Sequence, residues 1–193
     1  MEKLLSYDKK VFVETGTFHG MTIKSLLAKQ GPKNPLKSIK SCELIEYRSE
    51  RAKNFLEEFT KQNLEKHVNP TIELFAGKHS YEHLPEMVKD INEPAVFFLD
   101  AHPSKPEEII KEALARGDKR FTIRHIISSE LKVILSHHVK GHVIVIDDVD
   151  LKWLDSEVLS VFKHFNVLDK YNFYLDCDKP NFRKDKILFC EPI

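Results

Sequence analysis

Short apolar runs alternate with segments of helical periodicity along most of the chain. The strand-like runs lie at 11–13, 38–44, 71–75, 95–99 and 143–146. Each is followed, directly or after a polar insertion, by apolar residues spaced as on one face of an amphipathic helix. Strands separated by helices pair in parallel through right-handed crossovers. The alternation therefore predicts an α/β fold with a doubly wound, mostly parallel sheet.

Two further strand-like runs close the sequence, at 171–175 and 187–189. The turn-prone residues 178–181 lie between them. A connection this short suits antiparallel pairing, because a parallel crossover needs a dozen or more residues. We therefore expect a C-terminal antiparallel hairpin at one edge of the sheet.

At 193 residues the chain has the length of one domain, and no linker or internal repeat interrupts it. We predict a single domain over residues 1–193. The polar segment at about 103–123 departs from the alternation, and we interpret it as an insertion. A solvated charged face is one explanation of it. The other is a lid over a substrate, in which Arg116, Arg120 or Arg124 would bind a phosphate or carboxylate.

Lys plus Arg and Asp plus Glu both number 30, so the formal net charge is zero. Such a chain has no overall basic field that would attract nucleic acid or an anionic membrane. Its apolar runs are too short to span a bilayer. Its 3 cysteines form neither a disulfide framework nor a C-x-x-C pair. We expect a cytoplasmic protein whose partner is a small molecule, with no nucleic-acid or membrane partner.

Candidate binding residues follow the first two predicted strands. In open α/β sheets, ligands bind outside the carboxyl ends of the strands. The segment Glu14–Gly20 reads E-T-G-T-F-H-G, and its glycines permit a tight turn that brings N–H groups toward a ligand. Glu43 ends the second strand, where an acid accepts both hydroxyls of a ribose. A plain turn and a solvated strand end are the alternatives, but together the two features favour a ligand that carries adenosine.

Acidic residues also follow the fourth and fifth predicted strands. Asp100 precedes His102 by two positions, and Asp147 and Asp148 are adjacent. Like charges held close together are costly unless a cation or a shared proton offsets them. Oxygen-rich ligand sets favour Mg²⁺, Mn²⁺ or Ca²⁺ over zinc. We therefore predict a divalent metal site at Asp100, Asp147 and Asp148. The alternative is that Asp148 or Asp150 caps the following helix.

Four segments carry a family resemblance, in this order: V-E-T-G-T-F-H-G, S-C-E-L-I-E, V-F-F-L-D-A-H-P-S and V-I-V-I-D-D-V. In these segments the chain resembles the class I S-adenosylmethionine-dependent methyltransferases, which have a Rossmann-like fold. It is similar to bacterial and viral members with E-T-G-T, L-D-A-H and I-D-D signatures, and more loosely to metal-dependent O-methyltransferases. The resemblance implies an enzyme that uses S-adenosylmethionine and a divalent metal to O-methylate a small hydroxylated substrate.

The resemblance also implies roles for individual residues. The cofactor-binding residues would be Glu14, Gly16, Thr17, Gly20, Glu43, Gly77, His79, Ser80 and Asp100. The first loop would hold the methionine part of the cofactor and Glu43 its ribose. The metal would be bound by Asp100, Asp147 and Asp148. Asp100 and His102 are the predicted catalytic residues, with His102 accepting the proton of a substrate hydroxyl. A buried, hydrogen-bonded histidine is the alternative for His102.

One segment departs from the family pattern. After the third strand the family often has G-D-S, with the acid near the adenine, whereas this chain has Gly77-Lys78-His79-Ser80. This replacement leaves open a non-catalytic module that binds a nucleotide or phosphate. A metal-dependent hydrolase is a third possibility, but it leaves the glycine loop and Glu43 unexplained. Trp153, the single tryptophan, either lines a substrate pocket or packs in the core.

Overall fold

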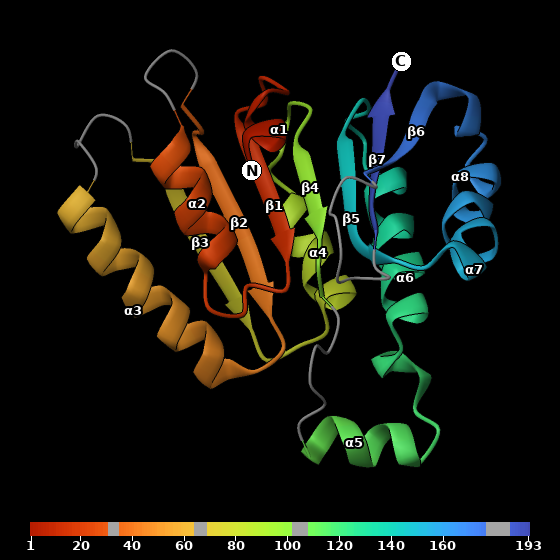
Figure 1. The fold of residues 1–193 in the computed structure, drawn as a ribbon, viewed down its shortest axis with the longest axis horizontal. Helices are drawn as coiled ribbons and strands as arrows, with labels where there is room; N and C mark the ends of the chain where they lie inside the picture. The colour runs from red at the N-terminus through yellow and green to blue at the C-terminus, as the bar shows by residue number, and fades with distance from the viewer. Residues whose placement is uncertain (31–34, 64–68, 102–107, 177–185) are drawn as a thin grey trace.

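The computed structural model describes residues 1–30, 35–63, 69–101, 108–176 and 186–193. Its strands form one seven-stranded sheet in the order β3-β2-β1-β4-β5-β7-β6 (Figure 1). The strand bounds are β1 Val11–Thr15, β2 Ser38–Glu43, β3 Thr71–Ala76, β4 Val96–Leu99, β5 Val143–Val149, β6 Tyr171–Asp176 and β7 Lys186–Pro192. All seven strands predicted from the sequence are therefore present.

Helices cover both faces of the sheet (Figure 1). One face carries α1 Glu2–Leu5, α2 Met21–Lys29 and α3 Glu46–Asn63. The other carries α4 Ser80–Val88, α6 Ile123–Ser136, α7 Leu151–Trp153, η3 Leu154–Leu159 and α8 Ser160–His164. The remaining helical segments are α5 Glu108–Ala115, η2 Lys119–Phe121 and η4 Leu168–Lys170.

The pairing confirms the predicted doubly wound α/β architecture. Strands β1 to β5 pair in parallel, with β2 and β4 on either side of β1. The strand order therefore reverses at β1, which opens a crevice at the carboxyl ends of β1 and β4. Strand β7 pairs antiparallel with both β5 and β6, as expected of the C-terminal hairpin.

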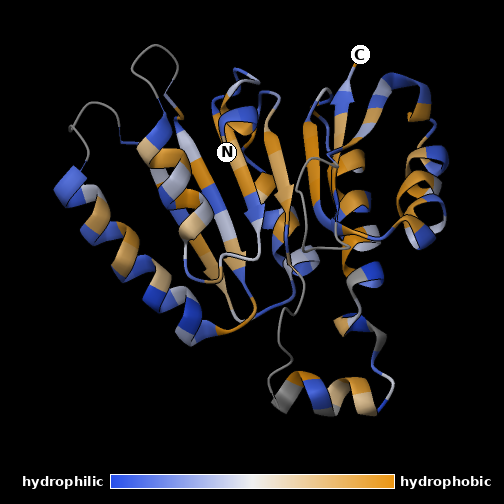
Figure 2. Ribbon diagram, viewed as in Figure 1, coloured by the Kyte–Doolittle hydropathy of each residue, from blue (hydrophilic) through white to orange (hydrophobic). Residues whose placement is uncertain are grey.

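The alternation of side chains along the strands divides the core into two layers. In β1, Val13 packs with the helices on the α4 and α6 face, whereas Phe12 packs with those on the α2 and α3 face. Strands β4 and β5 are apolar along most of their length (Figure 2) because helices cover them on both sides. Trp153 is 4% exposed and belongs to the first layer, which confirms its core interpretation.

The end of β5 is irregular, and this irregularity exposes two acids. The pairing of β5 with β7 shifts register between Ile146 and Val149. Asp147 and Asp148 lie in this bulge, and Asp148 has a left-handed φ of 56°. A β-bulge disrupts the hydrogen-bond ladder locally and changes the direction in which side chains point. The strand thus continues beyond Ile146, where the apolar run ends, while its two acids remain partly exposed.

The inserted segment contains more helix than its polar sequence indicates. Residues 103–107 lie outside the described part, but α5 and η2 occupy most of the rest. Ile110 and Ala113, nearly one helical turn apart, are buried and account for the formation of α5 in this charged stretch.

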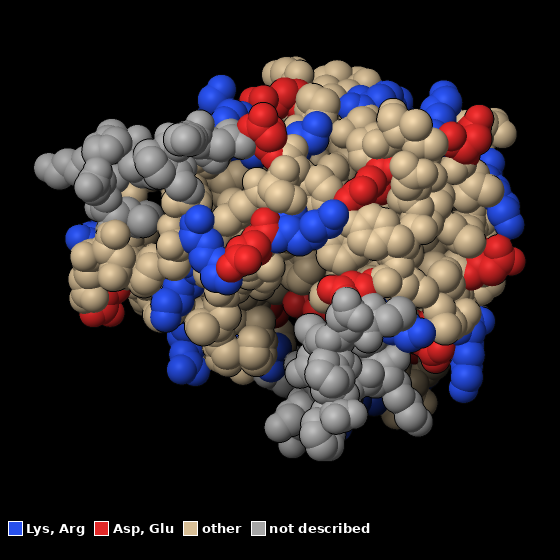
Figure 3. All heavy atoms as spheres, turned by 45° about the horizontal axis from the view of Figure 1, so that its top comes forward, with Lys and Arg blue, Asp and Glu red and all other residues tan. Residues whose placement is uncertain are grey.

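Charged side chains of both signs are interspersed on the face of the molecule drawn in Figure 3. This distribution agrees with the zero net charge of the sequence. No helix in the described residues has the length and hydropathy needed to cross a membrane.

Two buried histidines connect the amino ends of β4 and β5 to α4. The Ala95 N–H donates to His142 Nδ1 at 3.1 Å, so the proton of this imidazole lies on Nε2. His142 Nε2 therefore donates to His137 Nδ1 at 3.1 Å, and His137 Nε2 donates to the Val88 carbonyl at 3.0 Å. Both rings must be neutral for this chain of hydrogen bonds to form.

A fall in pH is expected to destabilise the fold because it protonates the His137–His142 pair. Burial, together with the neighbouring His137, lowers the pKa of His142 from 6.5 to about 4. The unfolded chain therefore binds more protons than the folded chain between these pH values, and stability falls as the pH falls from 6.5 to 4. We expect His142 to contribute a loss of about 3 kcal/mol over this range, measured by urea unfolding.

A His142→Gln variant keeps one donor and one acceptor but does not titrate, so its stability should depend less on pH over this range. His164→Gln, at an exposed position, is the matched control and should retain the full dependence. Equal pH dependence in the unsubstituted chain and in His142→Gln would contradict the assignment.

Candidate functional site

A pocket of about 680 Å³ opens at the carboxyl ends of β1, β2, β4 and β5. Its volume falls in the range of small-molecule sites, roughly 300–1,000 Å³. The residues that line it come from distant parts of the chain: Gly16, Phe18, Cys42, Glu43, Leu44, Ile45, Arg48, His79, Ser80, Asp100, Ala101, Ile110, Phe121, Ile126, Asp147 and Asp148. Of the predicted site residues, it therefore brings together Gly16, Glu43, His79, Ser80, Asp100, Asp147 and Asp148.

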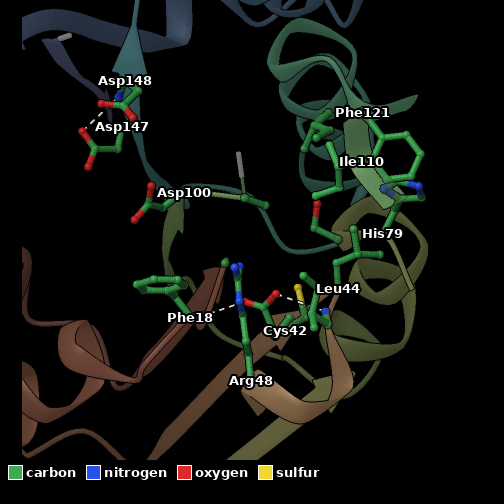
Figure 4. Close-up of a pocket in the computed structure, with 16 residues that line it drawn as sticks. Phe18, Cys42, Leu44, Arg48, His79, Asp100, Ile110, Phe121, Asp147 and Asp148 are labelled. Carbon is green, nitrogen blue, oxygen red and sulfur yellow. Dashed lines mark hydrogen bonds between the residues drawn. The ribbon is translucent and has the colours of Figure 1, made fainter. Parts of the chain in front are cut away.

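The pocket has two chemically different sides (Figure 4). The charged side consists of Arg48, Asp100, Asp147 and Asp148. The apolar side consists of Leu44, Ile110 and Phe121. A ligand that fills the pocket would need a polar or charged end and an apolar end.

Gly16 allows the loop after β1 to touch the end of β4. Its φ is +88°, and a Cβ built on it would collide with the Asp100 carbonyl and lie 2.8 Å from its carbon. The Asp100 N–H donates to the Thr15 carbonyl at 3.0 Å, which extends the β1–β4 pairing to this point. The close approach places the Asp100 side chain beside the glycine loop.

Glu43 joins the loops on the two sides of the pocket. Its Oε2 accepts the N–H of Phe18 at 2.9 Å, and its Oε1 accepts the N–H of Ile45 at 3.1 Å. Phe18 lies near the charged side, and Ile45 follows Leu44 of the apolar side (Figure 4). Each carboxylate oxygen accepts more than one hydrogen bond, so Glu43 can still bind hydroxyls at the centre of the pocket.

Glu14 and Thr17 do not line the pocket but support the glycine loop from below. Ser41 Oγ donates to Glu14 Oε2 at 2.7 Å, so the Thr17 hydroxyl, 2.6 Å from Ser41 Oγ, donates to Ser41. All three residues are at most 3% exposed. Burial raises the pKa of Glu14 to about 8, with Asp100 and Glu43 adding to the rise. Glu14 is therefore largely uncharged at neutral pH. Both residues support the loop in this structure, and their contact with a cofactor stays a prediction.

Gly20 and Gly77 also lie outside the lining residues. A Cβ on Gly20 would meet Leu56 at 3.2 Å, and one on Gly77 would meet Glu46 Oε1 at 2.7 Å. Both glycines allow close packing beside the site. Lys78 is exposed and does not line the pocket. His102, the second predicted catalytic residue, lies outside the described residues.

The predicted metal ligands Asp100, Asp147 and Asp148 share the charged side of the pocket. Within the described ranges, no three His, Cys, Asp or Glu side chains form a group that could hold a metal ion. Asp147 Oδ1 instead accepts the N–H of Asp148 at 2.9 Å (Figure 4). Asp150, rather than Asp148, caps the next helix by accepting the Lys152 N–H. The described residues thus give the metal no support, and its site stays a prediction.

Phe18 and Arg48 are among the lining residues that were not singled out from the sequence. Phe18 has a left-handed φ of 47° and is 42% exposed at the pocket. The guanidinium of Arg48, one turn into α3, lies 4.9 Å from the centre of the Phe18 ring. Such strain in a non-glycine residue often marks a functional site. Only the position of Phe18 inside the glycine loop could have indicated it, and no sequence pattern marks Arg48.

Comparisons of the sequence found no relatives: no protein-family model matches the chain, and no curated protein matches it. Comparison of the structure with solved structures did find matches. The O-methyltransferase TomG from Streptomyces achromogenes, in complex with SAM, matches with a TM-score of 0.56 and 16% identity, over 100% of this chain and 77% of that one. The chain has a methyltransferase-like fold.

Other solved structures give the same result. An O-methyltransferase from Bacillus cereus, in complex with SAH, has a TM-score of 0.56 and 15% identity, over 98% of this chain and 77% of that one. Spermidine synthase from Thermotoga maritima has a TM-score of 0.56 and 14% identity, over 97% of this chain and 55% of that one. At such low identity, the likeness establishes the fold and leaves the reaction open.

Replacing Gly16 by alanine should damage the site more than the backbone strain alone explains. Gly16→Ala adds both a left-handed strain of about 1–2 kcal/mol and a collision with the Asp100 carbonyl. Gly141→Ala is the matched control, because Gly141 has a φ of +76° and nothing within 4 Å of a built Cβ. We expect Gly16→Ala to lower the free energy of unfolding by about 1–3 kcal/mol more than the control. Equal losses in chemical denaturation would contradict the close packing.

Proposed function

We propose that the chain is an S-adenosylmethionine-dependent methyltransferase that O-methylates a small hydroxylated substrate. The observation that carries the proposal is the pocket, where Gly16, Glu43, Ser80 and Asp100 meet from the ends of four strands. These are residues at which the sequence predicts an adenosine-bearing ligand. Structures with the same fold were solved with SAM and SAH bound, which supports the choice of cofactor.

The charges of the pocket suit this cofactor. At neutral pH S-adenosylmethionine carries a positive sulfonium and a positive ammonium group. Glu43 lies beside the charged side, whose three aspartates outnumber its single arginine. Within a partly enclosed pocket, opposite charges interact more strongly than in bulk water. The charged side should therefore receive the sulfonium end of the cofactor, and the apolar side its base.

The bound cofactor would supply an activated methyl group, so the task of the protein is mainly positioning. Glu43, fixed by two backbone N–H groups, accepts hydrogen bonds from the ribose hydroxyls. Asp100 is held beside the glycine loop by the packing of Gly16. Its carboxylate accepts a hydrogen bond from the acceptor hydroxyl and orients the oxygen toward the methyl group. His102 remains the proposed proton acceptor for this step.

No observation favours the other two functions. Lys78 and His79 suggested a phosphate ligand. Lys78 is exposed and outside the pocket lining. His79 lines the pocket, but burial lowers its pKa and so disfavours the cationic form that would attract a phosphate. A metal-dependent hydrolase needs a metal-binding group, and none is found among the described side chains. A hydrolase would also leave unexplained why Glu43 and Gly16 share a pocket with an apolar side.

The proposal predicts binding of S-adenosylhomocysteine with one site per chain, measured by isothermal titration calorimetry. Glu43→Gln should weaken this binding about tenfold or more, because it removes a charged acceptor from the ribose. Glu86→Gln is the matched control, since Glu86 lies on the exposed surface of α4 and pairs with Lys89 there, and its affinity should match that of the unsubstituted chain. Absence of heat and of any thermal shift with the folded, unsubstituted chain would rule out the proposed function.

The metal is tested separately from the cofactor. If a divalent cation takes part, excess chelator should abolish methyl transfer, Mg²⁺ should restore it, and Asp147→Asn should weaken the restoration. Methyl transfer measured with radiolabelled cofactor on a panel of hydroxylated acceptors provides the readout. Unchanged transfer in chelator would remove Asp147 and Asp148 from the metal role and leave cofactor binding unaffected.

A further inference from the structure

Ser80 combines a place in the pocket lining with a buried hydroxyl that has no partner among the described residues. It begins α4, lines the pocket and is 7% exposed. Its Oγ is buried and has no hydrogen-bond partner among the described residues. A buried hydroxyl without a partner costs about 1–3 kcal/mol, so such a group usually has a ligand or water to bind. Because a hydroxyl both donates and accepts, Ser80 can pair with either kind of polar edge.

Phe121 belongs to the apolar side of the pocket and is held by a series of ring contacts. The His79 ring meets Phe121 edge-on, with centroids 4.7 Å apart and an interplanar angle of 68°. His79 also stacks on Tyr81 at 5.3 Å, and Tyr81 meets His125 edge-on at 5.6 Å. Figure 4 shows His79 and Phe121 together beside the apolar side of the pocket. The contacts join the turn after β3 to the inserted segment and α6.

The local structure around Phe121 fixes its position further. Asp118 accepts hydrogen bonds from the backbone N–H and from two guanidinium nitrogens of Arg120, which closes the turn of η2. Thr122 follows as the N-cap of α6. Arg120 is thus engaged by the residue that directly precedes η2, and it does not line the pocket. These observations disfavour Arg120 as the arginine that would bind a substrate.

We propose that Phe121 and Ser80 hold the base of the nucleoside cofactor, so that the inserted segment is part of the cofactor site. The inference rests on the proposed function and extends it. The apolar side offers the Phe121 ring to a face of a planar base, and Ser80 offers a hydrogen bond to its polar edge. A base that stacks on an aromatic ring needs no charged group of the protein to hold it. This explains how the base can bind although the acid of the family's G-D-S segment is missing after β3.

His79 acts in this arrangement as a positioning residue. Burial lowers the pKa of its imidazole, and the neighbouring Arg120 and His125 lower it further, against opposing effects of Glu82 and Asp118. The ring is therefore mainly neutral at pH 7 and packs on Phe121 as an aromatic surface. In this assignment its role is to set the angle of the Phe121 ring.

The experiment compares two ligands that share the base and ribose. S-adenosylhomocysteine and 5′-methylthioadenosine are titrated by calorimetry into the full chain and into Phe121→Ala, Phe121→Leu and Ser80→Ala. Base stacking is worth roughly 1–3 kcal/mol, so Phe121→Ala should weaken both ligands by the same factor, on the order of tenfold. Phe121→Leu should lose less, and Ser80→Ala should weaken both ligands by about threefold to tenfold.

Controls separate contact with the base from general damage to the fold. Lys132→Ala, at an exposed position on α6, should bind both ligands like the unsubstituted chain. His79→Ala should weaken both ligands, and His79→Phe, which restores a ring, should recover most of the loss. Thermal unfolding followed by circular dichroism identifies any variant that does not fold, in which case Phe121→Leu supplies the comparison.

The outcomes distinguish this inference from the proposed function. Equal weakening of both ligands by Phe121→Ala supports a contact with the base. Unchanged affinity, or a loss confined to S-adenosylhomocysteine, overturns the inference while cofactor binding itself stands. Failure of the unsubstituted chain to bind either ligand overturns the proposed function and the inference with it.

Discussion

The Glu43 carboxylate determines how the two sides of the pocket lie relative to each other. One of its oxygens accepts an N–H from the glycine loop after β1, and the other accepts an N–H from the turn that leads into α3. The side chain is 7% exposed, so few water molecules compete for these bonds. An ionised acceptor makes hydrogen bonds roughly twice as strong as a neutral one. The shape of the pocket therefore depends on a group that also faces its ligand.

A second constraint comes from the absence of a side chain at Gly16. Only there can the loop after β1 approach the Asp100 carbonyl. Beneath this contact, the hydroxyls of Thr17 and Ser41 form a hydrogen-bond chain that ends on the Glu14 carboxyl. An uncharged Glu14 adds no further negative charge under a pocket already lined by Glu43 and Asp100. At neutral pH, Glu14 therefore supports the glycine loop without adding charge repulsion to the acids of the pocket.

Much of the fold could be predicted from the sequence, because strand and helix periodicities are local signals. The apolar runs at 95–99 and 143–146 became the central strands β4 and β5. The strand ends also brought Gly16, Glu43 and Asp100 into one pocket, as parallel pairing requires. Local signals did not separate residues that face the pocket from those below it, such as Thr17. Whether a loop residue faces the pocket depends on which side of the loop packs against the neighbouring strand, as Thr17 does against Ser41 of β2.

The role of the inserted segment could not be predicted from the sequence because it arises from contacts distant along the chain. Phe121 stands in a charged stretch with no apolar periodicity, and His79 lies 42 positions earlier in the sequence. Only the tertiary structure brings their rings to 4.7 Å. The departure after β3 and the insertion therefore have one physical explanation: the imidazole that stands where an acid was expected is in contact with the ring that the insertion contributes. His79 and Phe121 lie in the two segments that differ from the family pattern, and in the folded chain their rings form one aromatic surface.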